Sequence, residues 1–140
     1  MKTAIIYWSG TGNTEAMAEA VADGAKAAGA EVDLIPAADF DASTVPTYDS
    51  LALGCPAMGA ETLEEEVFAP LFEDLKPALK GKKIALFGSY GWGDGEWMRT
   101  WEEDCISAGC VFATDSVICN EAPDDAALES CRALGAALAS

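Results

Sequence analysis

The sequence predicts an α/β protein with a doubly wound sheet of five parallel strands and helices on both faces. Three observations lead to this fold. Five short runs rich in apolar and β-branched residues have the length of strands, helical patterns fill the gaps between them, and the runs are nearly continuously apolar instead of alternating. Such strands, each followed by a helix, form parallel sheets through right-handed crossovers. Ligands of these sheets bind beyond the carboxyl ends of the strands, where the strand order reverses.

The expected strands are distributed along the whole chain. They cover Thr3–Trp8, Glu31–Pro36, Ser50–Cys55, Lys82–Gly88 and Cys110–Ile118. The connection Ala37–Thr47 has the weakest pattern of the chain.

The first helix is expected between the first two strands. Its apolar and small residues, which recur with helical spacing, are Met17, Ala20, Val21, Gly24, Ala25 and Ala28. Gly29 stands where a C-terminal cap glycine belongs, so the helix should end there.

The second and third helices are predicted from their starts. Thr62-x-x-Glu65 reads as a capping box that opens a helix reaching about Leu75, and Pro70 inside it should bend that helix. Asp94 can cap the third helix.

Trp97 and Trp101 lie four residues apart in the third helix, which is the spacing of core residues. The last helix follows Pro123, and its apolar face is expected to be Leu128, Cys131, Leu134 and Leu138.

Length and composition indicate one soluble domain. The chain has 140 residues, of which 51% are hydrophobic and 23% charged, and it shows neither an internal repeat nor a linker. The apolar run in MKTAIIYW is too short for a secretory signal, and no stretch approaches the ~18 apolar residues of a membrane span. We therefore expect a cytoplasmic protein that does not enter the membrane.

Charge and cysteine content exclude several classes of function. The net charge of -16, without any histidine, argues against nucleic-acid and anionic-membrane binding and favours a basic protein partner. The five cysteines include no C-x-x-C pair, so neither a disulfide framework nor a zinc or iron–sulfur site is expected. Most should be small buried hydrophobic residues.

The loop after the first strand has the composition of an anion site. It combines two glycines with hydroxyl and amide side chains, in the order Ser9, Gly10, Thr11, Gly12, Asn13 and Thr14. A helix start offers unpaired N–H groups and a partial positive charge, so the backbone alone can bind a terminal phosphate. The loop lacks the lysine of a nucleoside triphosphate loop, and Glu15 breaks the G-x-G-x-x-G dinucleotide pattern. The alternative is a capped turn that binds nothing.

Two further loops, after the third and fourth strands, each hold a large side chain among glycines. Met58 and Trp92 stand where no helical or strand period demands an apolar residue. A thioether and an indole suit the two faces of an aromatic heterocycle. Packing on neighbouring loops is the alternative for either residue.

At this point the chain resembles a known family. The segments Ser9–Thr14, Gly54–Glu61 (GCPAMGAE) and Phe87–Asp94 (FGSYGWGD) are similar to the phosphate loop and the two flavin-flanking loops of the short-chain flavodoxins. The resemblance covers essentially the whole chain. It implies the flavodoxin-like strand order 2-1-3-4-5, in one FMN-binding domain over residues 1–140.

The resemblance also implies roles for individual residues. Ser9–Thr14 would bind the FMN phosphate, Met58 and Trp92 would sandwich the isoalloxazine, and Glu61 would accept from flavin N3–H. The Gly59 carbonyl would meet N5–H after one electron and one proton arrive, which requires the Gly59–Ala60 peptide to flip. The expected cofactor-binding residues are Ser9, Gly10, Thr11, Gly12, Asn13, Thr14, Pro56, Ala57, Met58, Gly59, Ala60, Glu61, Ser89, Tyr90, Gly91, Trp92, Gly93 and Asn120. No catalytic residue and no metal ligand is expected. Ala60 and Pro56 depart from residues common in relatives.

The function implied is that of a low-potential one-electron carrier that shuttles electrons between redox enzymes on non-covalently bound FMN. A negatively charged protein environment that excludes water disfavours a further negative charge on the flavin, so the second electron should be hard to add. The alternatives are an FMN-binding module dedicated to one partner enzyme and a small quinone reductase. A low-molecular-weight phosphatase is excluded, because its C-x5-R motif requires arginine six positions after the cysteine. The residue six positions after Cys55 is Glu61.

The charge distribution predicts where partners dock on this expected monomer. Helix starts at the flavin edge carry the acidic residues Glu61, Glu64, Glu65, Glu66, Asp94, Glu96, Glu121, Asp124 and Asp125. The lysines that fall on the opposite rim are Lys2, Lys26, Lys76, Lys80, Lys82 and Lys83, with Arg99 as an exception. Basic-surfaced redox proteins should therefore be steered to the flavin edge.

Overall fold

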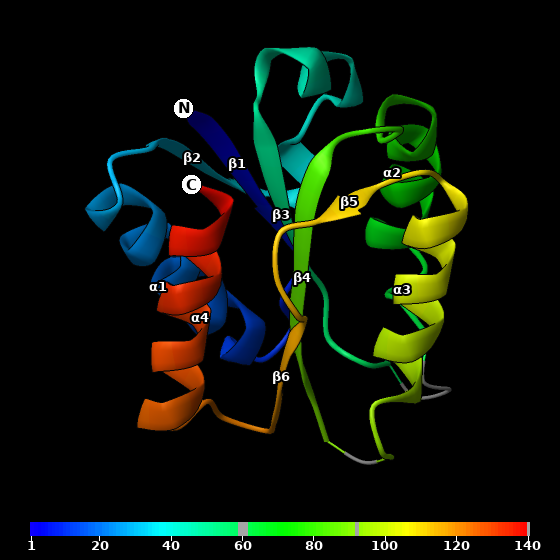
Figure 1. Ribbon diagram of the computed structural model, residues 1–140. Helices are drawn as coiled ribbons and strands as arrows, with labels where there is room; N and C mark the ends of the chain where they lie inside the picture. Colours follow the sequence, from blue (N-terminus) through cyan, green and yellow to red (C-terminus); the bar gives the residue numbers. More distant parts are fainter. Residues whose placement is uncertain (59–61, 92, 140) are drawn as a thin grey trace.

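A parallel sheet forms the centre of the computed structural model, which describes residues 1–58, 62–91 and 93–139 (Figure 1). Its strands are β1 (Lys2–Tyr7), β2 (Glu31–Pro36), β3 (Ser50–Gly54), β4 (Lys83–Tyr90), β5 (Val111–Phe112) and β6 (Val117–Asn120). The order is β2-β1-β3-β4-β5, with β6 also pairing with β4, and every pair is parallel. The predicted α/β class and the order 2-1-3-4-5 are confirmed.

The fifth strand differs from the prediction, because it is divided in two. Ile84 pairs with Phe112 and Phe87 pairs with Val117, so residues 113–116 lie opposite only residues 85–86 of β4. Polar side chains explain the break: Ser116 Oγ donates a 2.7 Å hydrogen bond to Glu102 Oε2 instead of continuing the edge strand. β5 and β6 together occupy the single edge position predicted for one strand.

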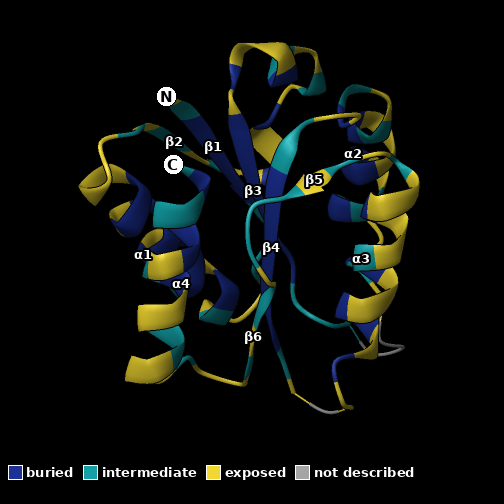
Figure 2. Cartoon of the chain, in the orientation of Figure 1, coloured by how far each residue is buried: buried dark blue, intermediate teal, exposed yellow. Residues whose placement is uncertain are grey.

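Two pairs of helices cover the two faces of the sheet. Helices α1 (Asn13–Ala27) and α4 (Asp125–Leu138) lie on one face, and α2 (Phe68–Leu75) and α3 (Glu96–Ser107) lie on the other (Figure 1). Short 3-10 helices at residues 37–39, 42–47 and 76–78 complete the elements. Figure 2 shows the buried residues concentrated in the strands and on the inward helix faces.

The core is divided by the sheet into two clusters of buried side chains. The α2/α3 side holds Trp97 and Trp101, each 1% exposed, which confirms their predicted core position. Phe68 meets Trp101 edge-on at 5.4 Å between ring centroids, and Trp97 Nε1 donates to the Cys55 carbonyl at 3.1 Å. The Trp97 indole therefore fixes α3 against the end of β3, and the Trp101 indole packs α3 on α2.

Helices α1 and α4 pack at backbone distance. A Cβ atom added to Gly24 would overlap the backbone of Arg132, and one added to Gly135 would overlap the backbone of Val21. Most of the apolar residues predicted for the two helices pack here, with Met17, Val21 and Leu134 almost completely buried, but Ala28, predicted on the same face, is exposed at the C-cap of α1. This pairing fixes α1, the helix that the first loop leads into, against α4.

The predicted starts of α2 and α3 are both wrong. α2 begins at Phe68, not at a Thr62–Glu65 capping box, because the carboxylate of Glu64 caps it instead. Glu64 Oε1 accepts from Val67 N at 2.7 Å and Phe68 N at 2.8 Å, and Oε2 accepts from Glu66 N at 2.8 Å. Glu64 is also only 5% exposed, which removes it from the predicted acidic surface.

Pro70 lies in the first turn of α2, where proline is compatible with a regular helix, so it does not interrupt the middle of a longer one as predicted. The N-cap of α3 is Gly95 rather than Asp94. The Asp94 carboxylate accepts instead from Arg99 Nη2 at 3.0 Å. The predicted C-cap at Gly29 is confirmed: its φ is 95°, and Ala30 N donates to Ala25 O across it.

Within the described residues, no helix combines the length and the apolar character that a membrane crossing requires.

Candidate functional site

A pocket of about 540 Å³ lies at the carboxyl ends of β1, β3, β4 and β6. This volume falls within the ~300 to 1,000 Å³ typical of small-molecule sites. Its lining residues are Trp8, Gly10, Thr11, Asn13, Pro56, Ala57, Met58, Ser89, Tyr90, Gly91, Glu121 and Ala122. Four separate loops therefore converge at the edge where the sequence places the site.

The first loop presents the start of α1 to this pocket. Gly12 is the N-cap with a φ of 94°, and no side chain among the described residues caps the helix. Gly12 N donates to Ser9 Oγ at 3.1 Å, which closes the loop on itself. The first-turn amides and the Asn13 side chain thus stand next to the pocket as potential donors, with the positive end of the helix dipole behind them.

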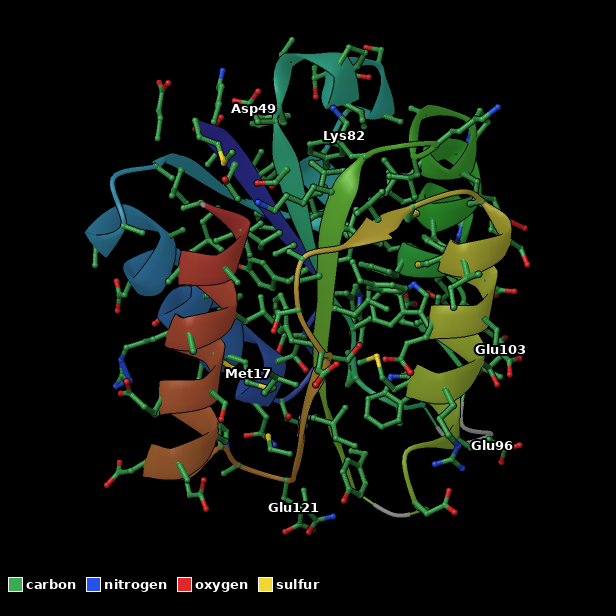
Figure 3. The ribbon with its side chains drawn as sticks, in the orientation of Figure 1. Met17, Asp49, Lys82, Glu96, Glu103 and Glu121 are labelled. Carbon is green, nitrogen blue, oxygen red and sulfur yellow. The ribbon has the colours of Figure 1, made fainter. Side chains whose placement is uncertain are left out.

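Hydrogen bonds join the end of β4 to the end of β6 and the loop after it. Ser89 Oγ donates to the Glu121 carbonyl at 2.6 Å, and Glu121 N donates to the Tyr90 carbonyl at 2.7 Å. These bonds hold Glu121 at a φ of 57°, which is uncommon for a residue with a Cβ. Asn120 Nδ2 adds a 3.3 Å bond to Tyr90 O. Figure 3 shows Glu121 at the end of the molecule where β6 ends.

Many of the predicted site residues meet in this pocket, and others lie beside it. The predicted residues that line it are Gly10, Thr11, Asn13, Pro56, Ala57, Met58, Ser89, Tyr90 and Gly91. Ser9 and Gly12 line a neighbouring pocket of about 340 Å³, which shares Trp8 and Gly10 with the first. Thr14 is 1% exposed, and its hydroxyl accepts from Ser89 N at 3.4 Å.

Asn120 lines a further pocket beside the start of α4, while Gly93 lies in the β4–α3 loop with a φ of 87° and lines none of these three pockets. Four predicted residues, Gly59, Ala60, Glu61 and Trp92, lie outside the described residues.

Three lining residues are absent from the predicted set, namely Trp8, Glu121 and Ala122. Trp8 follows β1 directly, and its ring lies about 3.0 Å from where a Cβ on Gly10 would stand. The sequence could have indicated Trp8 as a pocket residue, because it is a large aromatic residue directly before a glycine-rich loop. The strained backbone of Glu121 left no such signal, because it depends on contacts with Ser89 and Tyr90 from a distant strand.

The site is poor in groups that could carry out acid–base or nucleophilic chemistry. Cys55 is fully buried next to the pocket, and burial raises the pKa of its thiol to about 12, so it stays protonated at neutral pH. Glu121 is the one charged residue among the described residues that line the pocket. The arrangement suits the binding of a ligand with a phosphate and an apolar body.

Comparison with known proteins decides the family. The flavodoxin family model matches residues 5–135. This chain belongs to the flavodoxin family. It is 50% identical to a flavodoxin of Megasphaera elsdenii over 135 residues, 96% of each chain, and 49% identical to one of Clostridium beijerinckii over 122 residues, 87% and 88% of the two chains.

Solved structures agree with this family. The solution structure of two-electron reduced Megasphaera elsdenii flavodoxin superposes with a TM-score of 0.90 over 98% of both chains, at 50% identity. A flavodoxin from the domain Archaea, 28% identical, gives a TM-score of 0.88 over 99% of this chain and 96% of the other. As a flavodoxin, the chain is an electron carrier that binds FMN.

The described residues fit this cofactor. The cation-free start of α1 offers backbone donors for one phosphate, and the pocket beside it has the volume of a small-molecule site with Trp8, Met58 and Tyr90 on its wall. FMN, when bound, supplies the electron-transfer chemistry.

Proposed function

We propose that the 540 Å³ pocket binds FMN with its phosphate at Ser9–Thr14 and its ring between the loops after β3 and β4, so that electrons pass at an acidic edge. The observation that carries this proposal is the convergence of four strand-end loops next to an uncapped helix start. The proposal includes all of the cofactor-binding residues predicted from the sequence, among them Gly59, Ala60, Glu61 and Trp92.

The geometry of the first loop supports phosphate binding at Ser9–Thr14. Gly12 adopts a φ of 94°, and no atom lies within 4 Å of the position that a Cβ would take there, so the loop is shaped for close approach by a ligand. The hydrogen bond from Gly12 N to Ser9 Oγ closes the loop in this shape. An anion placed here would gain several N–H donors and the helix dipole, and it would need no lysine.

The side chains of the pocket wall support ring binding between the loops after β3 and β4. Met58 lies in the loop after β3 and Tyr90 ends β4, and the two segments are hydrogen-bonded, since Ala57 N donates to Ser89 O at 3.0 Å. Trp8 adds an aromatic side chain from the end of β1, next to Gly10. We assign Met58 and Trp92 to the two faces of the ring, Glu61 to N3–H and the Gly59 carbonyl to N5–H.

The docking proposal follows from charge. Exposed acidic residues at the pocket end are Glu65, Glu66, Asp94, Glu96, Glu121, Asp124 and Asp125. Figure 3 shows Glu121 and Glu96 toward one end of the molecule and Lys82 at the other. Asp49 lies near Lys82, so acidic residues occur at both ends of the molecule. The two ends differ in how densely acidic residues are placed, and not simply in the sign of their charge. Basic redox proteins would be attracted to the pocket end.

We further propose a cytoplasmic, low-potential, single-domain monomer without substrate chemistry of its own. All five cysteines are free thiols, as a reducing compartment would keep them. The net charge of -16 opposes self-association, and the absence of histidine removes the commonest general base.

The experiment is the rate of electron transfer to a basic haem protein at increasing ionic strength. The rate should fall steeply with salt. The variant E66K/E96K, which reverses two charges at the pocket end, should slow the reaction at low salt. The control E31K/D23K carries the same charge change away from the pocket and should slow it much less. If both variants slowed electron transfer equally, the net charge of the protein would set the rate, and the proposed docking at the pocket end would be contradicted.

A further inference from the structure

We propose that Cys105 and Cys110 form a reversible dithiol–disulfide pair at the C-terminal end of α3. Its oxidants would be low-molecular-weight disulfides. The pair lies at the end of α3 that joins β5, whereas the β4–α3 loop and the FMN pocket lie at the other end of the sheet (Figure 1). It is therefore a site separate from electron transfer.

The end of α3 has the geometry that brings these two side chains together. Gly109 has a φ of 86°, Gly109 N donates to Ile106 O at 3.0 Å, and Cys110 N donates to Cys105 O at 3.1 Å. These are the paired bonds of a Schellman motif, in which the residue after the glycine packs its side chain on the residue five positions earlier. Those two residues are Cys110 and Cys105.

The packing of the core agrees with this placement. Cys105 is 0% exposed within the α2/α3 cluster, and Cys110 is partly buried against the same cluster. The neighbouring Cys105 thiol lowers the pKa of Cys110, whereas the neighbouring Cys110 together with burial raises the pKa of Cys105. Cys110 is thus both the accessible member and the one with more thiolate character, which is the character of an attacking sulfur.

The other helix with the same cap shows that cysteine is not required there. At the end of α1, Ala30 N donates to Ala25 O and Gly29 takes the positive φ, so alanines hold the positions that correspond to Cys110 and Cys105. The motif itself closes equally well without sulfur. Two cysteines at the cap of α3 add a chemical possibility that the fold does not need.

The reaction balances as two thiol–disulfide exchanges. The Cys110 thiolate attacks one sulfur of glutathione disulfide, which forms a mixed disulfide at Cys110 and releases one glutathione. Cys105 then loses its proton and attacks the Cys110 sulfur, which forms the intrachain bond and releases the second glutathione. The protein loses two electrons and two protons, and the oxidant gains them as two thiols.

The test uses the folded, FMN-loaded protein in glutathione buffers of increasing oxidised fraction, followed by alkylation and peptide mass spectrometry. We expect a Cys105–Cys110 link within one chain, the loss of two hydrogens in mass, and full recovery with dithiothreitol. The variant C105A should instead accumulate glutathione on Cys110, and C110S should show neither product at residues 105 and 110. Circular dichroism checks that each variant is folded.

The variant C119S is the control for non-specific oxidation, because Cys119 is the other partly exposed thiol. It should leave the Cys105–Cys110 link unchanged. The proposal is overturned if residues 105 and 110 remain thiols while the protein is folded, or if the link forms only after denaturation. It is equally overturned if C119S abolishes the link.

Discussion

Ser89 and Glu121, which both line the pocket, are joined by a 2.6 Å hydrogen bond from the Ser89 hydroxyl to the Glu121 carbonyl. Ser89 is 4% exposed and lies near the end of β4, and Glu121 follows β6 with a φ of 57°. The bond therefore fixes a strained residue of the β6–α4 loop to a buried residue of β4. The shape of the pocket on this side depends on it.

The first prediction is that S89A weakens FMN binding. Removing the hydroxyl leaves the Glu121 carbonyl without its short bond, so the β6–α4 loop should relax away from the pocket. We expect an affinity loss of roughly 10-fold, equivalent to about 1.4 kcal/mol. Flavin fluorescence quenching during reconstitution measures it. S116A, which removes the 2.7 Å bond to Glu102 near β5, should leave the affinity unchanged.

The second prediction concerns Gly12, whose φ of 94° disfavours any L side chain although the space around it is open. G12A should cost about 1 kcal/mol in the loop conformation. Because FMN needs that conformation, its affinity should fall about fivefold, as measured by calorimetric titration.

Gly29 is the matched control for Gly12, since it has a φ of 95°, equally open surroundings and a place at the other end of α1. G29A should reduce the free energy of unfolding by a similar amount without changing FMN affinity. If G29A weakened FMN binding as much as G12A, the loop geometry would not be the reason.

The third prediction concerns the Glu64 cap. Burial alone would raise the Glu64 pKa, but the backbone N–H groups of Phe68, Val67 and Glu66 outweigh it and lower the pKa. The carboxylate therefore contributes stability that is fully present above the unfolded pKa of about 4.3 and is lost as the pH falls through the folded value. E64Q should cost about 2 kcal/mol at pH 7, and this difference should shrink below pH 4.

Urea unfolding of the apoprotein at pH 7 and pH 3.5 checks the Glu64 prediction. E65Q is the control, because Glu65 is the adjacent exposed residue and should have little effect at either pH. A pH-independent loss in E64Q would mean that its packing matters and its charge does not.

The strands and the pocket edge were predictable because their signals are local. An apolar run marks a buried strand wherever its neighbours are, and glycine-rich loops after β1, β3 and β4 reach the same edge once the sheet is parallel. Even the break between β5 and β6 has a local sign in the polar pair Asp115–Ser116.

The features that sequence reasoning missed depend on distant contacts. The capping box at Thr62 matched a valid pattern, but the Glu64 carboxylate reached three amides ahead of it and delayed the helix to Phe68. The role of Glu121 in the pocket comes from bonds with Ser89 and Tyr90, about thirty residues earlier. No short window of sequence contains both sides of such a contact.

The most direct test of the central claim is calorimetric titration of the apoprotein with FMN and, separately, with riboflavin, which lacks only the phosphate. Binding of one FMN per chain, with riboflavin weaker by about 100-fold or more, is the result expected if the cation-free loop Ser9–Thr14 binds the phosphate. Equal affinities for the two flavins would contradict the account, because the loop would then contribute nothing to binding.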